Sequence, residues 1–233
     1  MRISIFIPAI FCLCIAACKQ EKHDVFTPEI TDSELKLCDS LRIDESVLKE
    51  LKTKSQSNIS RLYYSLGKAY GPDGKEAISP TGYLNGIMVH SKNAASESLV
   101  NELSAEFRKN GYSIFVVENN FGLNGKDDNI AVVKDTSFAN IIKLIGTDGA
   151  NYNITNDSVI AVINSFAARF NTQLLGVSGD WISLKVSGGV SDWNALAEEV
   201  AKIAPDVVSQ GSGSNSELAK EMEASKIIYL WWD

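Results

Sequence analysis

The chain has 233 residues, of which 45% are hydrophobic, and carries 22 Lys and Arg against 29 Asp and Glu, for a formal net charge of −7. This length and apolar content suit one sizeable globular core or two small ones. The acidic balance argues against binding to nucleic acid and against electrostatic attraction to anionic lipids, because both favour basic surfaces.

The first 17 residues have the pattern of an export signal. Arg2 precedes the apolar run IFIPAIFCLCIAA, which is too short to span a membrane and matches the core of a signal peptide. The run ends in two small residues before Cys18, and this ending resembles the lipobox of bacterial lipoprotein precursors. We therefore expect a signal peptide over residues 1–17, cleavage before Cys18 and lipidation of that cysteine. The alternative is an ordinary secretory signal with a chance cysteine.

A lipid on Cys18 would hold the chain at a membrane of the cell envelope. A diacylglyceryl group on the thiol and an acyl chain such as palmitate on the freed amine give a stable anchor. Lys19 stands in place of the aspartate that marks inner-membrane retention, so the outer membrane is favoured over the inner membrane. Residues 18–31 are expected to comprise the lipidated cysteine and a flexible tether. Cys38 would remain as the one ordinary thiol of the mature chain. Its apolar neighbours favour a buried, inert thiol, and the alternative is a reactive or intermolecular one.

Beyond the tether, hydrophobic periodicity predicts alternating helices and strands. Residues 32–85 are expected to form a helical and loop-rich N-terminal part, and residues 86–233 a globular domain. The expected helices cover residues 32–40, 45–54, 95–110, 137–145, 155–170 and 217–225, with another that Ser191 caps and Pro205 ends. The expected strands cover residues 59–66, 87–90, 112–118, 129–134, 173–177, 181–186 and 227–233, with a surface loop at 71–74 and a short extended piece at 206–209.

The order of these elements indicates the fold class. The strands lack strict βαβ spacing, and residues 173–177 and 181–186 flank a connection short enough for a hairpin. We therefore predict an α+β fold with a mixed sheet and helices mostly on one face. On the second strand of the hairpin, alternation places Trp181, Ser183 and Lys185 on one face.

Three segments of the C-terminal part carry a resemblance to a known family. They are residues 146–152 (GTDGANY), residues 179–181 (GDW), and residues 205–211 (PDVVSQG), which lead to the terminal LWWD. Their order and spacing resemble the bacterial domain of unknown function 4253 (DUF4253) over about residues 130–233. That family has no established activity, so the resemblance implies one domain and supplies no reaction. Ala204 stands where family members often have a cysteine, which argues against a functional thiol there.

The loop at residues 146–152 is the first candidate ligand site. It precedes a helix and offers backbone amides with Asp148, Asn151 and Tyr152, which would suit a small anionic or sugar-like ligand. The alternative is a tight connection whose polar side chains satisfy its own backbone. The segment that begins at Gln210 also leads into a helix, but it lacks the lysine and the spacing of a P-loop, so a flexible loop is the simpler interpretation.

Aspartates and tryptophans near strand ends form the second candidate site. Asp180 and Asp206 lie beside such ends, and Trp181 and Trp232 each follow or precede an aspartate directly. An acidic and aromatic rim would suit carbohydrate binding, or hydrolysis with Asp180 and Asp206 as the catalytic pair. The alternative is that the aspartates end strands while the tryptophans fill the core.

The sequence lacks the residue patterns of metal sites and of Ser, His and Asp catalysis. His23 lies in the tether and His90 at a strand end, with no second histidine or cysteine at ligand spacing, so we expect no metal site. No Ser, His and Asp set accompanies a nucleophile elbow. We expect no cofactor.

These patterns favour a non-catalytic binding module at the envelope that recognises a protein partner or a small ligand. The protein partner includes the immunity type, in which an acidic domain faces a basic toxin. The alternatives are an envelope hydrolase that acts on a glycan and a structural envelope lipoprotein. The expected partners are therefore the membrane, through Cys18, and a protein, with nucleic acid excluded by charge.

Overall fold

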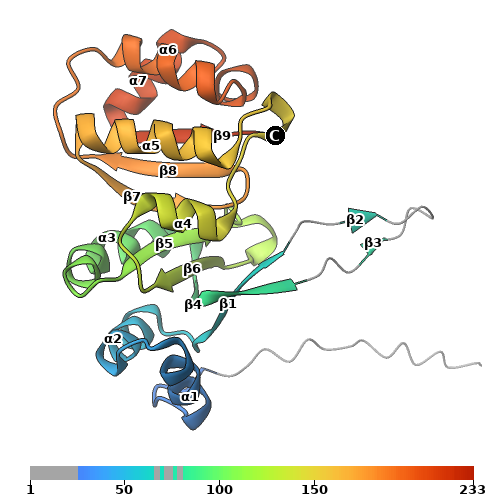
Figure 1. Cartoon of the computed structure of the whole chain (residues 1–233), viewed down its shortest axis with the longest axis vertical. Helices are drawn as coiled ribbons and strands as arrows, with labels where there is room; N and C mark the ends of the chain where they lie inside the picture. Colours follow the sequence, from blue (N-terminus) through green and yellow to red (C-terminus); the bar gives the residue numbers. More distant parts are fainter. Residues whose placement is uncertain (1–25, 66–68, 71–75, 78–80) are drawn as a thin grey trace, which may run out of the picture.

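The computed structural model describes residues 26–65, 69–70, 76–77 and 81–233. The predicted signal peptide, the predicted lipidation site Cys18, His23 and the predicted loop at 71–74 lie outside the described residues. A seven-stranded sheet runs through the molecule, and helices pack on it (Figure 1). The prediction of a mixed sheet in an α+β fold is confirmed.

Helices and strands alternate along most of the chain. The α-helices are α1 (Asp32–Leu41), α2 (Glu45–Ser55), α3 (Asn93–Lys109), α4 (Phe138–Ile145), α5 (Asn156–Phe170), α6 (Trp193–Ile203) and α7 (Asn215–Ser225), with shorter helical turns η1 (Leu123–Gly125), η2 (Ala150–Tyr152) and η3 (Val207–Ser212). The strands are β1 (Ser60–Ser65), β2 (Ala69–Tyr70), β3 (Glu76–Ala77), β4 (Thr81–Ser91), β5 (Ser113–Glu118), β6 (Asp128–Val133), β7 (Thr172–Val177), β8 (Trp181–Val186) and β9 (Ile227–Trp231).

Strand order divides the large sheet into two antiparallel halves. The order is β1-β4-β6-β5-β7-β8-β9, and β2 pairs with β3 separately. All neighbours in the large sheet are antiparallel except β5 and β7, which run parallel with Val116 opposite Gly176. The predicted hairpin forms β7 and β8, and the terminal strand β9 lies at one edge. The β5–β7 pair is therefore the junction of the two halves.

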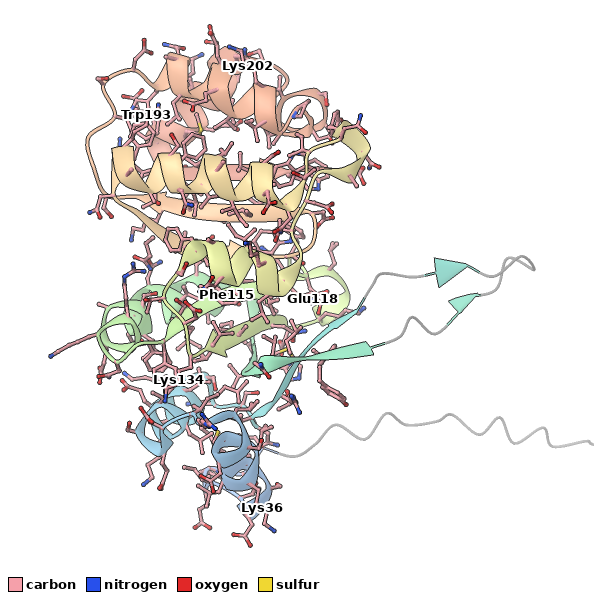
Figure 2. The ribbon with its side chains drawn as sticks, viewed as in Figure 1. Lys36, Phe115, Glu118, Lys134, Trp193 and Lys202 are labelled. Atoms are coloured by element: carbon pink, nitrogen blue, oxygen red, sulfur yellow. The ribbon has the colours of Figure 1, made fainter. Side chains whose placement is uncertain are left out.

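Two apolar cores lie on opposite faces of the sheet. One core contains Phe115 and the buried faces of α4, α5, α6 and α7. The other contains Leu48, Phe107 and the buried faces of α1, α2 and α3. Figure 2 labels Phe115 inside the molecule, with Lys36 and Lys202 near its two far ends. The described α-helices thus divide between the two faces, four on one and three on the other, and do not lie mostly on one face as predicted, because both faces of the sheet are apolar.

The N-terminal part shares the sheet with the rest of the chain. The globular domain was expected to begin at residue 86. β1 precedes that residue, yet it pairs along the long strand β4 and belongs to the same sheet. α1 and α2 pack on the same face of the sheet as α3. Residues 32–65 therefore contribute to one continuous structure with the C-terminal part.

Two local predictions are wrong. Asp192 rather than Ser191 caps α6, because its carboxylate accepts hydrogen bonds from the backbone amides two and three residues later. Residues 207–212 form the helical turn η3 rather than an extended piece. The Asp206 carboxylate accepts hydrogen bonds from side chains three and four residues later, and this spacing favours the helical turn.

A buried ion pair joins the two N-terminal helices to the sheet. Lys52 of α2 donates from Nζ to both carboxylate oxygens of Glu34 in α1, at 2.8 and 2.6 Å, and both side chains are buried. The same carboxylate accepts from the backbone amides of Thr31 and Ile59, each at 2.8 Å. Burial would raise the pKa of Glu34, but these hydrogen bonds together lower it below its ordinary value of 4.5.

Cys38 lies buried beside this ion pair, with 2% of its surface exposed. Burial raises the pKa of its thiol to about 11, and the nearby charges of Asp39 and Glu34 add to the shift. The thiol stays protonated at neutral pH and is a poor nucleophile. Among the residues that the structure describes, no helix is both long and apolar enough to span a membrane.

Replacement of Lys52 by Met should lower the free energy of unfolding by about 3–5 kcal/mol, because Glu34 would remain buried without its cation. Lys49→Met is the matched control on the same helix, since Lys49 pairs with Glu45 in solvent, and it should cost less than about 1 kcal/mol. Urea unfolding at neutral pH measures both. The difference in the free energy of unfolding between wild type and Lys52→Met should become smaller as the pH falls through the lowered pKa of Glu34, because the carboxylate then becomes neutral. Equal costs for the two variants would contradict the role of the pair.

Candidate functional site

Several predicted site residues meet at one corner of the sheet, where residues 146–152 lie against the β7–β8 turn. The backbone amide of Asp148 donates to the carbonyl of Gly179 at 3.0 Å, and the side-chain amide of Asn151 donates to the carbonyl of Asp233 at 2.6 Å. The Asp148 carboxylate accepts from the backbone amide two residues later. The polar groups of the loop therefore hold the chain together at this corner.

Asp206 is the centre of the same corner. Only 2% of its surface is exposed. Its Oδ1 accepts from the hydroxyls of Tyr152 (2.6 Å) and Ser209 (3.2 Å) and from the amide of Gln210 (3.1 Å), while Oδ2 accepts from the backbone amide of Asp233 (2.9 Å). The bond from Tyr152, followed by that from Asp233, lowers the pKa of Asp206. The carboxylate stays ionised and joins three segments of the chain.

Asp180 lies at the surface of the β7–β8 turn. Protein around its carboxyl group displaces water and raises its pKa, and the like charge of Asp233 adds to the shift. The pKa values of Asp180 and Asp206 thus move apart, as they do in an acid–base pair. Asp206, however, is closed off from solvent, and four donors occupy its oxygens. The arrangement does not let both carboxylates flank a glycosidic bond, as carboxylate-pair hydrolysis requires.

The two predicted tryptophans lie on opposite faces of the sheet. Trp232 is 3% exposed and donates from Nε1 to the carbonyl of Ile203 at 2.7 Å. It packs so closely on Gly149 that an added Cβ there would lie 2.7 Å from the indole ring. Trp181 packs against the core of the other face and remains partly exposed. The two rings therefore do not form one rim.

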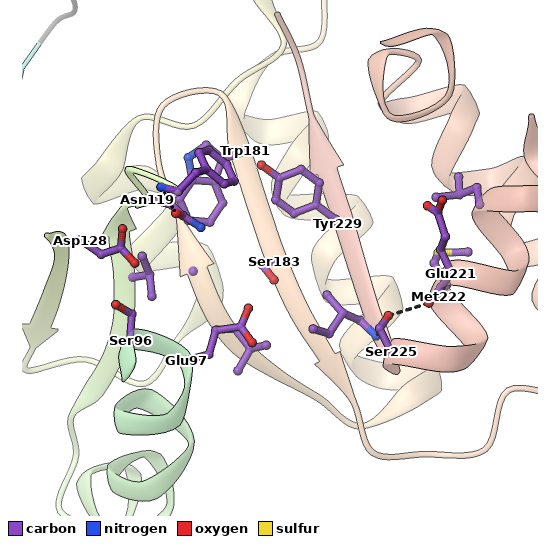
Figure 3. A pocket seen from close by; sticks show the side chains of 16 residues that line it. Ser96, Glu97, Asn119, Asp128, Trp181, Ser183, Glu221, Met222, Ser225 and Tyr229 are labelled. Atoms are coloured by element: carbon purple, nitrogen blue, oxygen red, sulfur yellow. Dashed lines mark hydrogen bonds between the residues drawn. The ribbon is translucent and has the colours of Figure 1, made fainter. Parts of the chain in front are cut away.

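Trp181 belongs instead to a groove of about 600 Å³ (Figure 3). Its floor is the face of β7, β8 and β9, beyond the part of the sheet that α3 covers. Ser96 and Glu97 at the start of α3 lie along one wall, and Glu221 of α7 lies along the other. The loop between β5 and β6 contributes Asn119 to one end. The groove thus draws its lining from elements that are far apart in sequence.

Small residues make the floor of this groove hollow. Gly176 of β7 pairs with Ser183 of β8, and neither side chain fills the space above the sheet. The ring of Trp181 lies over Gly176, where an added Cβ would come within 2.5 Å of Cζ3 of the indole. Tyr229 of β9 stacks beside Trp181 with ring centroids 6.0 Å apart and an interplanar angle of 27°. The groove therefore offers an aromatic surface beside an open space.

The polar groups of the groove are carboxylates and neutral groups. Glu97 and Glu221 are exposed, whereas Asp128 at the loop end is 1% exposed. None of the lining residues is Lys, Arg or His. Burial, with a contribution from the nearby Asp180 charge, raises the pKa of Tyr229 to about 12. The phenol therefore stays protonated and neutral at physiological pH.

Trp181 was a predicted site residue, whereas Tyr229, Gly176, Glu97 and Glu221 were not predicted. Alternation along the terminal strand was a signal for Tyr229, since it fixes which side chains of that strand share a face. The sequence spacing of Glu97 and Glu221 did not predict that they lie at one site, because only the fold brings α3 and α7 to the same groove.

Metal ligation has no support in the part of the chain that the structure describes. No group of three or more His, Cys, Asp or Glu side chains there is arranged to hold an ion. His90 bonds through Nδ1 to Oδ1 of Asn129 at 2.7 Å, and Asn129 donates to Glu118 at 2.6 Å. These contacts link neighbouring strands of the N-terminal half.

Asp206→Asn should lower the midpoint of urea unfolding, because the amide nitrogen cannot accept the hydrogen bond that Asp206 receives from the backbone of Asp233. Asp148→Asn is the matched control at the same corner, since the Asp148 carboxylate accepts one local hydrogen bond. The shift should be larger for Asp206→Asn than for the control. Equal shifts would mean that Asp206 does not hold the corner together.

Comparison with known proteins gives one match. No curated protein and no solved structure matches the chain. The matched segment begins within β6 and contains α4, α5, β7, β8, α6, α7 and β9, whereas the α3 wall of the groove precedes it. Residues 129–233 match the family described as Domain of unknown function (DUF4253), which confirms a DUF4253-like domain in the C-terminal part of this chain.

Proposed function

We propose that this chain is a lipid-anchored, non-catalytic binding module of the cell envelope, and that a protein partner occupies the groove lined by Trp181 and Tyr229. The observation that carries the proposal is the stacked aromatic pair beside a hollow of about 600 Å³. Partly exposed Trp and Tyr side chains in a concave surface are typical of binding sites, because they supply large contact areas at low entropic cost.

The chemistry of the carboxylates supports binding over catalysis. Asp206 is buried and fully engaged in hydrogen bonds, so it serves the fold. Glu97 and Glu221 stand on opposite walls of the groove, where their negative charges can face a bound cationic group. A binding role needs only their charge.

Anchoring is supported by the sequence before the described residues. Cys18 follows an apolar run with two small residues directly before it, and Lys19 after it favours the outer membrane. An anchored module needs no membrane-spanning helix, because two acyl chains suffice. The proposal therefore places the groove at the surface of a membrane, where a partner in the same compartment can reach it.

Cys18→Ser should move the protein from the membrane fraction to the soluble fraction and abolish labelling by a palmitate analogue, because the thiol that carries the lipid is lost. Cys38→Ser is the matched control, since Cys38 is buried in the folded domain, and it should remain in the membrane fraction. Cell fractionation followed by immunoblotting measures both. A Cys18→Ser protein that is still labelled and still sediments with membranes would contradict the anchor.

Trp181→Ala should reduce recovery of the partner by about tenfold or more, because loss of a central aromatic side chain removes much of the affinity of an interface. The tagged, lipidated protein is purified from mildly solubilised membranes of its native host, and co-purifying proteins are identified by mass spectrometry. Trp193→Ala is the matched control, since Trp193 is partly exposed on α6 outside the groove. Unchanged recovery with Trp181→Ala, or no stoichiometric partner of the wild type, would overturn the proposal.

A further inference from the structure

We propose that the groove recognises a positively charged side chain, a guanidinium or an ammonium group, on a basic segment of the partner protein. This inference rests on the proposed function and adds the chemistry of the occupant. It follows from three features of the groove: the sign of its charges, its aromatic floor and an unused hydroxyl.

The charges of the groove are of one sign. Its ionisable carboxylates are Glu97 on α3, Glu221 on α7 and Asp128 at the loop end, and no cationic residue lines it. No salt bridge joins Glu97 or Glu221 to a cation in the described part of the chain. An anionic occupant would be repelled by this lining, whereas a cation between the walls would face carboxylates on both sides.

The floor offers the faces of two aromatic rings. A cation over the face of Trp or Tyr is attracted by the quadrupole of the ring, and Trp is the strongest of the aromatic side chains in this respect. The chain already uses such contacts elsewhere, with Nζ of Lys226 at 4.8 Å from the ring centroid of Trp193. Trp181 and Tyr229 have no cation of this kind among the described residues. The occupant of the groove would supply it.

Ser183 offers a hydroxyl group on the floor of the groove. Its side chain lies on the floor between the walls, with 9% of the residue exposed, and Figure 3 shows it among the lining side chains. Its hydroxyl makes no hydrogen bond to another residue of the described chain. The hydroxyl oxygen reaches the open space of the groove, where it can bond to water or to a ligand. The hydroxyl can accept a hydrogen bond from a guanidinium or ammonium group.

The rim favours a polypeptide over a free amine. Phe121 and Leu123 of the loop beside the groove are each 65% exposed, and such apolar side chains suit contact with a protein surface. Phe121 has a φ of 51°, in the left-handed region that bulky side chains rarely adopt, and its backbone amide donates to Oδ1 of Asn119. The hydrogen bond to Asn119 thus holds the backbone of Phe121 in this conformation, and the loop presents the aromatic side chain at the mouth of the groove.

The test measures binding of fluorescein-labelled hexa-arginine to the full-length, lipidated protein in neutral detergent by fluorescence anisotropy. Hexa-citrulline is the matched probe, because citrulline has nearly the shape of arginine without the charge. The wild type should bind hexa-arginine, and Trp181→Ala or the pair Glu97→Gln with Glu221→Gln should each weaken it by about tenfold. Ser183→Ala, which removes only a hydroxyl, should weaken it by a smaller factor. Urea unfolding confirms that each variant is folded.

A second pair of Glu→Gln substitutions controls for the overall acidity of the protein. Glu198→Gln with Glu223→Gln removes the same charge from exposed positions of α6 and α7 that do not line the groove. It should weaken hexa-arginine binding by less than about threefold, since exposed charges outside the groove are screened by salt and do not contact the occupant. Equal losses for the two pairs, equal binding of hexa-citrulline, or absence of binding would overturn the inference. Tighter binding of spermidine than of hexa-arginine would overturn a protein occupant.

Capture of the native partner separates this inference from the proposed function. If Trp181→Ala loses the partner while Glu97→Gln with Glu221→Gln retains it, the groove binds a neutral surface, and only the cationic occupant is wrong. If both variants retain the partner, the groove is not the binding site, and both proposals fail. Loss of the partner with both variants, but not with Glu198→Gln and Glu223→Gln, supports both.

Discussion

The contact of the Trp181 ring with Gly176 determines both the junction of the sheet and the groove. Gly176 pairs with Val116 across the parallel β5–β7 junction, and an added Cβ at Gly176 would meet the indole at 2.5 Å and the Val116 carbonyl oxygen at 3.0 Å. Only glycine lets the ring lie flat on the sheet at this point. A larger residue would lift Trp181 into the hollow, where it would fill the space that now lies open.

Polar groups differ in their hydrogen bonding between the corner around Asp206 and the groove lined by Trp181. At the corner, Asp206 has four donors and Asn151 bonds to the C-terminal residue, so the charge of Asp206 contributes to the fold. In the groove, the carboxylates of Glu97 and Glu221 reach solvent, and the hydroxyl of Ser183 lacks a partner among the described residues. Satisfied groups stabilise a structure, whereas groups without partners retain their capacity to bind something else.

The sequence predicted the local elements better than their assembly. Alternation correctly placed Trp181 and Ser183 on one face of β8, and the apolar end of the chain correctly indicated a strand, because both follow from neighbours in sequence. The role of Asp206 was not predictable, since its donors come from three separate segments. The same limit applies to Glu97, which reaches the groove only because α3 packs across the sheet. Long-range pairing is set by packing that spacing does not encode.

The position of β6 has a consequence for how the molecule assembles. β6 lies between β4 and β5, yet both of those strands precede it in the chain. A chain that emerges N-terminus first therefore exposes β4 and β5 before their common neighbour exists, and neither strand can pair with β6 until residues 128–133 arrive. The family match begins within this late strand. The C-terminal segment thus supplies the strand that joins β4 to β5, so the N-terminal half of the sheet is complete only after this segment has been made.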